Sequence, residues 1–173
     1  AQGTIGEIIN AFVEWRLDAR KGVTYFARWH AEKEKSGGLM VHKASHYLDL
    51  VNWWLEDVPV TVYGMGRRAF FGADNAHKHG LKPNEGCYLD DDSRDDPFRP
   101  KPATLEMFRE RYADASQYDG YRADRSVWRQ YSMDIEDSMN VLVGYNSGKL
   151  LNFTLNAFLP HGGRSIVLNG TKG

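Results

Sequence analysis

The sequence has a single cysteine, Cys87, and no long apolar run. One cysteine excludes an intramolecular disulfide framework and a zinc module built from several cysteines. It fits a reducing compartment, so we expect a cytoplasmic location. No stretch approaches the roughly 18 apolar residues that a membrane-spanning helix needs, so we expect no membrane partner.

Net charge is also almost absent, because 22 Lys and Arg residues stand against 23 Asp and Glu residues. A nucleic-acid-binding domain is usually basic, and no useful Lys/Arg run appears, so we expect no nucleic acid partner. The chain also lacks GxSxG, Walker-type and GxGxxG motifs, which argues against an autonomous nucleotide-binding enzyme. The 173 residues suit one domain with one core, spanning residues 1–173.

Alternating apolar and polar residues predict strands near both ends of the chain. Residues 5–17 alternate in this way, and residues 58–66 form a second run rich in β-branched side chains. Residues 139–145 and 151–159 alternate on either side of the turn sequence YNSGK, which predicts an antiparallel hairpin. Residues 164–170 add a further strand.

One main helix is predicted from Val41, with apolar residues at helical spacing as far as Leu55. Residues 67–133 are interpreted as an elaborated insertion with one or two short helices. The order predicts an α+β domain, with a mostly antiparallel, open-faced sheet and the main helix on one face. The uncovered face would suit a subunit interface, so we expect a homo-oligomer formed through the sheet.

The main helix carries His42, His46 and Asp49 at i, i+4 and i+7, which places them on one stripe beside the apolar one. Imidazole titrates near neutrality, so the stripe could transfer protons or bind zinc. The alternative is that His46 is a partly buried structural histidine, bonded to a neighbour.

Four nearby residues are further candidates for a binding site. Lys43 would lower the pKa of His42 if the two side chains approach, although it could equally be a solvated charge. His30 could lie near the start of the helix. Gly37 and Gly38 would permit close approach of a ligand, although loop glycines are common.

Three other features carry less information. The acidic run DDDSRDD at 90–96 offers oxygen ligands, but it lacks the order of a calcium-binding loop and is interpreted as a solvated loop. His77 and His79 are too few for a metal site. Cys87 has no visible partner and is interpreted as inert.

The segment GGLMVHKASHYLDLVNWWL resembles the signature of the Gfo/Idh/MocA oxidoreductases, in their C-terminal, substrate-binding domain. The opening strand, the hairpin in EDSMNVLVGYNSGKLLNFTL and the closing NGTKG fit that domain, and residues 67–133 match more loosely. The resemblance implies a two-domain enzyme, in which a Rossmann domain binds NAD or NADP and supplies a catalytic lysine from a Lys-Pro element. The fingerprint of that domain and a matching Lys-Pro element are missing here, so we expect a fragment that is inactive alone.

The resemblance also implies roles for individual residues. The family's acid/base histidine falls on His46, the aspartate often found four residues earlier falls on His42, and the later acidic position is kept as Asp49. The substrate would be a sugar, a polyol or a related small carbohydrate. His42 would join His46 as a catalytic residue and, with Lys43, position substrate oxygens, while His30 and Asp49 orient that set.

Three other functions stay open from the sequence. One is an NAD-dependent glycoside-cleaving enzyme of the same superfamily. Another is a zinc-binding hydrolytic site on His42 and His46. The last is a purely structural oligomerisation domain.

Overall fold

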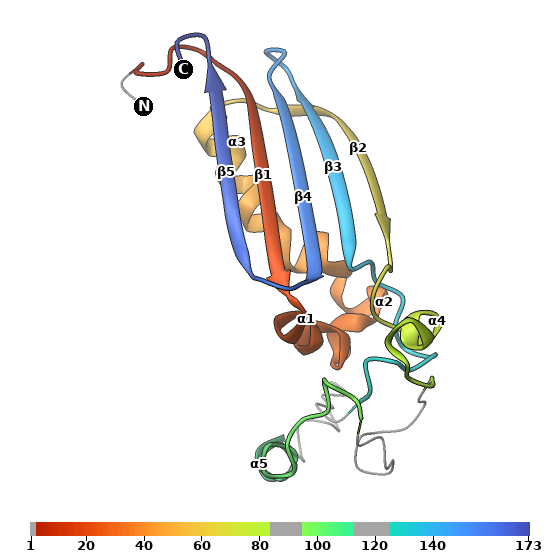
Figure 1. The fold of residues 1–173 in the computed structure, drawn as a ribbon. Coiled ribbons are helices and arrows are strands. Elements are labelled where there is room, and N and C mark those ends of the chain that lie inside the picture. The colour runs from red at the N-terminus through yellow and green to blue at the C-terminus, as the bar shows by residue number, and fades with distance from the viewer. Residues whose placement is uncertain (1–2, 84–94, 113–124) are drawn as a thin grey trace.

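The computed structural model describes residues 3–83, 95–112 and 125–173, which build one long five-stranded sheet with helices on one side and at one end (Figure 1). The strands follow the spatial order β2-β3-β4-β1-β5. β1 pairs with β4 in parallel, and the other pairings are antiparallel. The predicted mostly antiparallel sheet is therefore confirmed. The bounds are β1 (Ile8–Asp18), β2 (Pro59–Arg67), β3 (Ser138–Tyr145), β4 (Leu150–Leu159) and β5 (Gly163–Gly170).

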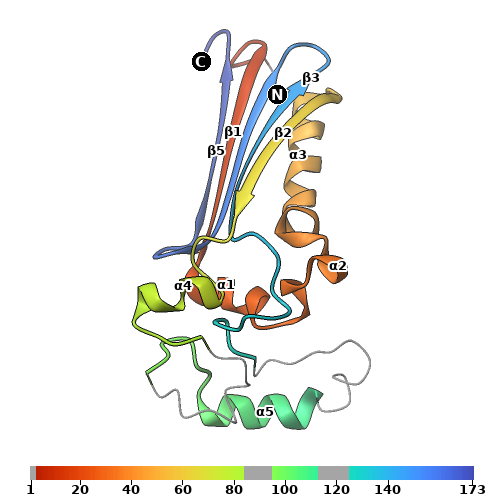
Figure 2. The same cartoon turned by 90° about the vertical axis from the view of Figure 1, so that its right-hand side faces the viewer.

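The core lies between the sheet and α3 (Ser45–Leu55), which runs along one face (Figure 2). Tyr47, Val51 and Leu55 of α3 are buried. Burying a large apolar side chain contributes about 1.5–3 kcal/mol, so this contact fixes the position of the helix. Alternate residues of the two central strands face it: Ala11, Val13, Trp15 and Leu17 from β1, and Leu151, Phe153, Leu155 and Ala157 from β4.

The opposite face of the sheet carries no helix in the described part of the chain (Figure 2). Strand pairing places Phe12, Tyr63 and Leu142 on this face, together with Met65 and Leu150. These large apolar side chains are between 45% and 68% exposed. The predicted open face is therefore present, and we refer to it as the open face.

Short helices gather at the lower end of the sheet in both views (Figures 1 and 2). Around the site they are α1 (Ala19–Phe26), η1 (Trp29–Ala31) and α2 (Lys33–Ser36). Within the segment 67–133 they are α4 (Ala73–Ala76), η3 (His77–His79) and α5 (Pro102–Tyr112). This end of the molecule contains the chain segments that precede α3.

α1 is a helix that the sequence analysis did not predict, because residues 18–36 are charged and interrupted by glycines. Asp18 begins it by accepting a hydrogen bond from the backbone N–H of Lys21 at 2.9 Å. Gly22 then packs directly on β4, because a Cβ there would lie 1.9 Å from the carbonyl oxygen of Ala157. The glycine is thus a packing residue in a helix.

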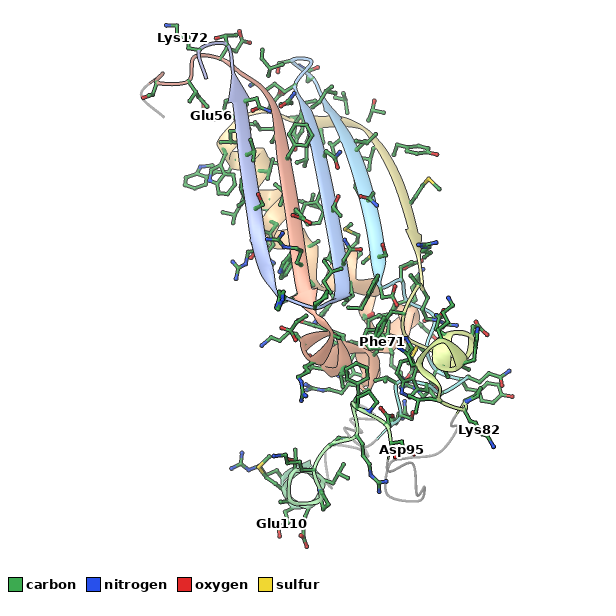
Figure 3. The ribbon with its side chains drawn as sticks, in the orientation of Figure 1. Glu56, Phe71, Lys82, Asp95, Glu110 and Lys172 are labelled. Carbon is green, nitrogen blue, oxygen red and sulfur yellow. The ribbon has the colours of Figure 1, made fainter. Side chains whose placement is uncertain are left out.

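Asp137 ties the lower segments to the sheet. Its fully buried carboxylate accepts backbone N–H groups from Ala69 at 2.7 Å and from Phe70 and Phe71 at 2.9 Å. Burial raises the pKa of Asp137, while these hydrogen bonds and the charge of Arg68 act in the opposite direction. The carboxylate thereby fixes the chain after β2, and Figure 3 shows Phe71 at this lower end beside α4.

Several expected features fall in or beside parts of the chain that the structure does not describe. Cys87 and most of the acidic run lie outside the described residues. Asp96, at the end of that run, is 7% exposed and accepts the backbone N–H of Phe98 at 2.8 Å, so it stabilises a turn. Among the residues described, none of the helices has the length and apolar character to cross a membrane.

Candidate functional site

The predicted helix from Val41 does not start as an α-helix. A π-helical turn, η2 (Met40–Ala44), precedes α3. The wider turn, with hydrogen bonds from residue i to i+5, lets Leu39 and Ala44 both enter the core, where they are 1% and 0% exposed. This corrects the prediction of a regular helix, and single π turns often mark functional sites.

The π turn separates the two histidines of the expected stripe. The ring of His42 packs into a group from the chain before the helix. Its centroid lies 4.5 Å from His30, 5.5 Å from Trp29 and 6.2 Å from Tyr25, in edge-to-face geometry. In the part of the chain that is described, no ring contact joins His42 to His46.

His46 instead lies against the core of the sheet. Its ring is 5.8 Å from Trp15 of β1, in edge-to-face geometry, and 4.2 Å from the neighbouring Tyr47. Trp15 and Tyr47 are 5% and 7% exposed, while His46 itself is exposed. Two buried rings therefore hold an imidazole that stays open to a ligand.

His30 is the most buried imidazole of the site, with 9% of its surface exposed. It stacks on Trp29 with centroids 3.9 Å apart, and its Nδ1 is buried without a hydrogen-bond partner in the described residues. Burial lowers the pKa of His30 to about 4, helped by the charges of His42 and Arg28. His30 is therefore neutral at pH 7 and keeps an unused polar atom inside the site.

The pKa of His42 is also lowered. Burial lowers its pKa, and the charge of Lys43 lowers it further, as expected from their adjacency. A neutral imidazole at this position can accept a hydrogen bond or a proton. The pair of His30 and His42 thus offers two uncharged imidazoles at the lower end of α3.

Two cations flank the aromatic pair that supports His46. The Nζ of Lys43 lies 5.5 Å from the centre of the Trp15 ring, and the guanidinium carbon of Arg164 lies 5.4 Å from that of Tyr47. Arg164 pairs directly with Trp15 across β1 and β5. The sequence analysis missed Arg164, because only this strand pairing brings it to the site.

The aromatic neighbours Tyr25 and Trp29 were also missed. The only local signal was their place in VTYFARWH, beside the candidate His30. Both rings contact His30 and His42, so they shape the imidazole pair.

The remaining predicted residues, Asp49, Gly37 and Gly38, do not belong to the aromatic groups around the histidines. Asp49 is exposed on α3 and makes no hydrogen bond or ion pair with His42 within the described residues. Gly37 and Gly38 have φ angles of +71° and +81°, which L side chains rarely adopt. Backbone geometry accounts for both glycines, and their role toward a ligand stays a prediction.

The described residues give no support for a metal site. They contain no group of three or more His, Cys, Asp and Glu side chains close enough to hold an ion. The zinc alternative on His42 and His46 therefore lacks a ligand set in this part of the chain.

Three grooves lined by described residues lie away from the histidines. Two are on the open face, with volumes of about 520 and 420 Å³, and both include Tyr63 and Leu142. The third, about 550 Å³, lies between the start of α1 and the turn after β4. Of the three site histidines, His42 and His46 are exposed at the surface of the domain, and His30 is buried.

Comparison with known proteins gives a consistent result. The family model described as the oxidoreductase family, C-terminal alpha/beta domain, named GFO_IDH_MocA_C, matches residues 1–173. The Bacillus subtilis (strain 168) protein YteT, named as an oxidoreductase, is 33% identical over 181 residues. The match covers 99% of this chain and 42% of YteT, so the chain spans about two fifths of that relative.

Solved structures show the same fold at low identity. An oxidoreductase domain protein from Kribbella flavida superposes with a TM-score of 0.56 at 16% identity, over 99% of this chain and 34% of its own. Scyllo-inositol dehydrogenase from Lactobacillus casei, with NAD(H) and scyllo-inositol bound, gives 0.55 at 13% identity, over 99% and 34%. The WlbA dehydrogenase from Bordetella pertussis, in complex with NADH and UDP-GlcNAcA, gives 0.54 at 16% identity, over 98% and 33%.

Proposed function

The chain belongs to the Gfo/Idh/MocA oxidoreductase family as its C-terminal alpha/beta domain, and on that premise we propose that it is the substrate-binding part of an NAD(P)-dependent enzyme acting on a sugar, a polyol or a related carbohydrate. The relatives from Lactobacillus casei and Bordetella pertussis, with inositol and a UDP-sugar bound, support this substrate class. The observation that carries the proposal is the exposed ring of His46, held by Trp15 and Tyr47.

The dinucleotide itself would be bound mainly outside this chain. A dinucleotide fold is built from parallel strands joined by crossover helices. The described sheet has one parallel pairing, β1 with β4, and its other pairings are antiparallel. The residues present therefore fit the substrate side of the reaction, and this domain alone is inactive. NAD or NADP, when bound, supplies the hydride acceptor.

The residues of this chain hold the substrate and move its proton. The Nδ1 or Nε2 atom of His46 takes the proton of the reacting hydroxyl, and its fixed ring reduces the reorientation that the step needs. His42 accepts a hydrogen bond from a substrate hydroxyl, because it is neutral at pH 7. Lys43 donates to a substrate oxygen. His30 packs against His42 and fixes its ring.

The remaining predicted residues have supporting parts in the same proposal. Asp49, exposed on the helix that carries His46, offers an acceptor for a second hydroxyl. Gly37 keeps exposed backbone ahead of the π turn, whereas Gly38 is buried there. The open face, with its exposed apolar side chains, would join copies of the chain into a homo-oligomer.

A second candidate rests on His42. The family resemblance implies an aspartate at this position, and an imidazole there differs from a carboxylate in charge and in basicity. This makes an NAD-dependent glycoside-cleaving enzyme the second hypothesis, after the dehydrogenase. Release of nitrophenol from nitrophenyl glycosides by the full-length protein with NAD would identify it, and NADH production from free sugars would identify the dehydrogenase.

Substitution of His46 tests the proposal in the full-length protein. General acid–base catalysis contributes about 10²–10⁴-fold in rate, so His46→Gln should lower kcat by that order, with the melting temperature and NAD binding unchanged. His161→Gln is a matched control, because that histidine is exposed in the turn after β4. Unchanged turnover in His46→Gln would show that His46 is not the acid/base.

A further inference from the structure

We propose that the substrate carries an anionic group, and that Arg164 with Lys43 recognises it beside His46. The proposal rests on the proposed function and specifies its substrate class. An acidic sugar, with a carboxylate or a phosphate, would place its neutral ring hydroxyls at the histidines and its charge between the two cations.

The geometry centres on Trp15. Its buried ring contacts both His46 and Tyr47, the latter at 4.5 Å between centroids. Lys43 lies over the Trp15 ring from the π turn, and Arg164, which pairs with Trp15 along β5, lies over the Tyr47 ring. The reacting imidazole and both cations therefore surround one rigid aromatic pair.

Neither cation is neutralised by a carboxylate of the described residues. Among the described residues Lys43 and Arg164 form no ion pair with a carboxylate, and each has a ring as its recorded partner. By comparison, Arg16 on the other face of β1 pairs with Glu14 at 3.2 Å. An aromatic face orients a cation and leaves its hydrogen-bond donors free for a ligand.

Other charged residues of this region support the same inference. Arg28 helps to lower the pKa of His30, and Lys43 helps to lower that of His42, so a cationic side chain acts on each of the two imidazoles. Asp49 is the acidic group on the same helix, and it is exposed and outside the aromatic pair. Arg164 contributes a planar fork that matches two oxygens of a carboxylate, and Lys43 adds a point charge.

Binding measurements on the full-length protein with NAD test the inference. The probes are matched pairs, D-glucuronate with D-glucose and D-galacturonate with D-galactose, and D-glucose 6-phosphate is the phosphate arm. Titration calorimetry gives each dissociation constant. A charge-assisted contact corresponds to about ten-fold or more in affinity, so at least one acidic probe should bind that much more tightly than its neutral partner.

Variants test whether Arg164 carries the preference. Arg164→Gln should reduce the preference toward unity, leaving the neutral sugar unaffected, and Arg164→Lys should restore part of it. Arg16→Gln, on the opposite face, should keep the preference of the wild type. Melting temperatures identify any variant that fails to fold, and the Lys variant then carries the test.

The outcomes separate this inference from the proposed function. If no acidic probe binds more tightly than its neutral partner, or if Arg164→Gln keeps the preference, the inference is overturned. A preference for the carboxylates over the phosphate assigns the ligand as a uronate, and the reverse order assigns a sugar phosphate. The proposed function fails on a different result, unchanged turnover in His46→Gln.

Discussion

The imidazole rings of His30 and His42 lie edge to face with their centroids 4.5 Å apart, although they come from separate helical segments. His30 is buried and His42 is exposed, both contact Tyr25 and Trp29, and each has a lowered pKa. The pair is therefore uncharged at neutral pH, and this has a measurable consequence for stability.

Stability should fall as the pH drops from 6.5 to about 4, because His30 has these pKa values in the unfolded and folded states. In this window the unfolded chain takes up a proton at His30 and the folded chain does not. The stability that neutral His30 contributes is therefore complete above pH 6.5 and is lost progressively as the pH falls toward 4. Its size is at most about 3 kcal/mol. His30→Gln should flatten the fall in melting temperature. An identical pH profile in His30→Gln would contradict the assignment.

Asp137→Asn should destabilise the domain by about 2–4 kcal/mol. The amide has one acceptor oxygen where the carboxylate has two, so at least one of the three backbone N–H donors loses its buried partner. Urea denaturation gives the change in the free energy of unfolding. Asp74→Asn is the control, because its ion pair with Arg68 is largely exposed and is expected to contribute less than about 1 kcal/mol. Equal effects of the two substitutions would disprove the role of Asp137.

Gly22→Ala should cost about 1–3 kcal/mol, because the added methyl group meets the carbonyl oxygen of Ala157, which belongs to the backbone of β4 and cannot rotate away. Gly64→Ala on β2 is the matched substitution, since its new methyl group would have no neighbour closer than 3.6 Å. Thermal denaturation should separate the two variants. If both behave alike, α1 does not pack as closely on β4 as the structure shows.

Met65→Asp should weaken a homo-oligomer that forms through the open face. Met65 is 68% exposed on that face, and a buried, unpaired carboxylate at an interface is costly. Val62→Asp is the control, because Val62 is 66% exposed on the other face of the same strand. Sedimentation of the full-length variants measures the assembly. Dissociation by Val62→Asp alone would move the interface to the helix side.

The strand pattern was predictable because its cause is local. Alternation with period two gave all five strands and the hairpin within a few residues of their observed bounds, such as Ile8–Asp18 for the strand predicted at 5–17. The main helix followed from apolar spacing in the same way. The residues GGLMVHKASHYLDLVNWWL also indicated the family, which the family model and YteT confirm.

α1 and the π turn were not predictable by these means. Gly22 looks like a helix breaker, and only the approach of β4 shows why a glycine is needed there. The π turn exists because Leu39 and Ala44 both enter the core, and this depends on the position of the sheet. The π turn also determines which aromatic rings His42 and His46 contact.

By itself, then, the sequence determined the α+β class, the open face, the family and the identity of the candidate histidines, since each depends on local periodicity or on a contiguous motif. The tertiary structure alone decided that His30 lies against His42 and that Trp15 and Tyr47 hold His46. It also decided that Arg164 lies beside them. The contacts of Trp15 with His46 and with Arg164 join segments far apart in the chain, and strand pairing and core packing fix them through distances that no local pattern encodes.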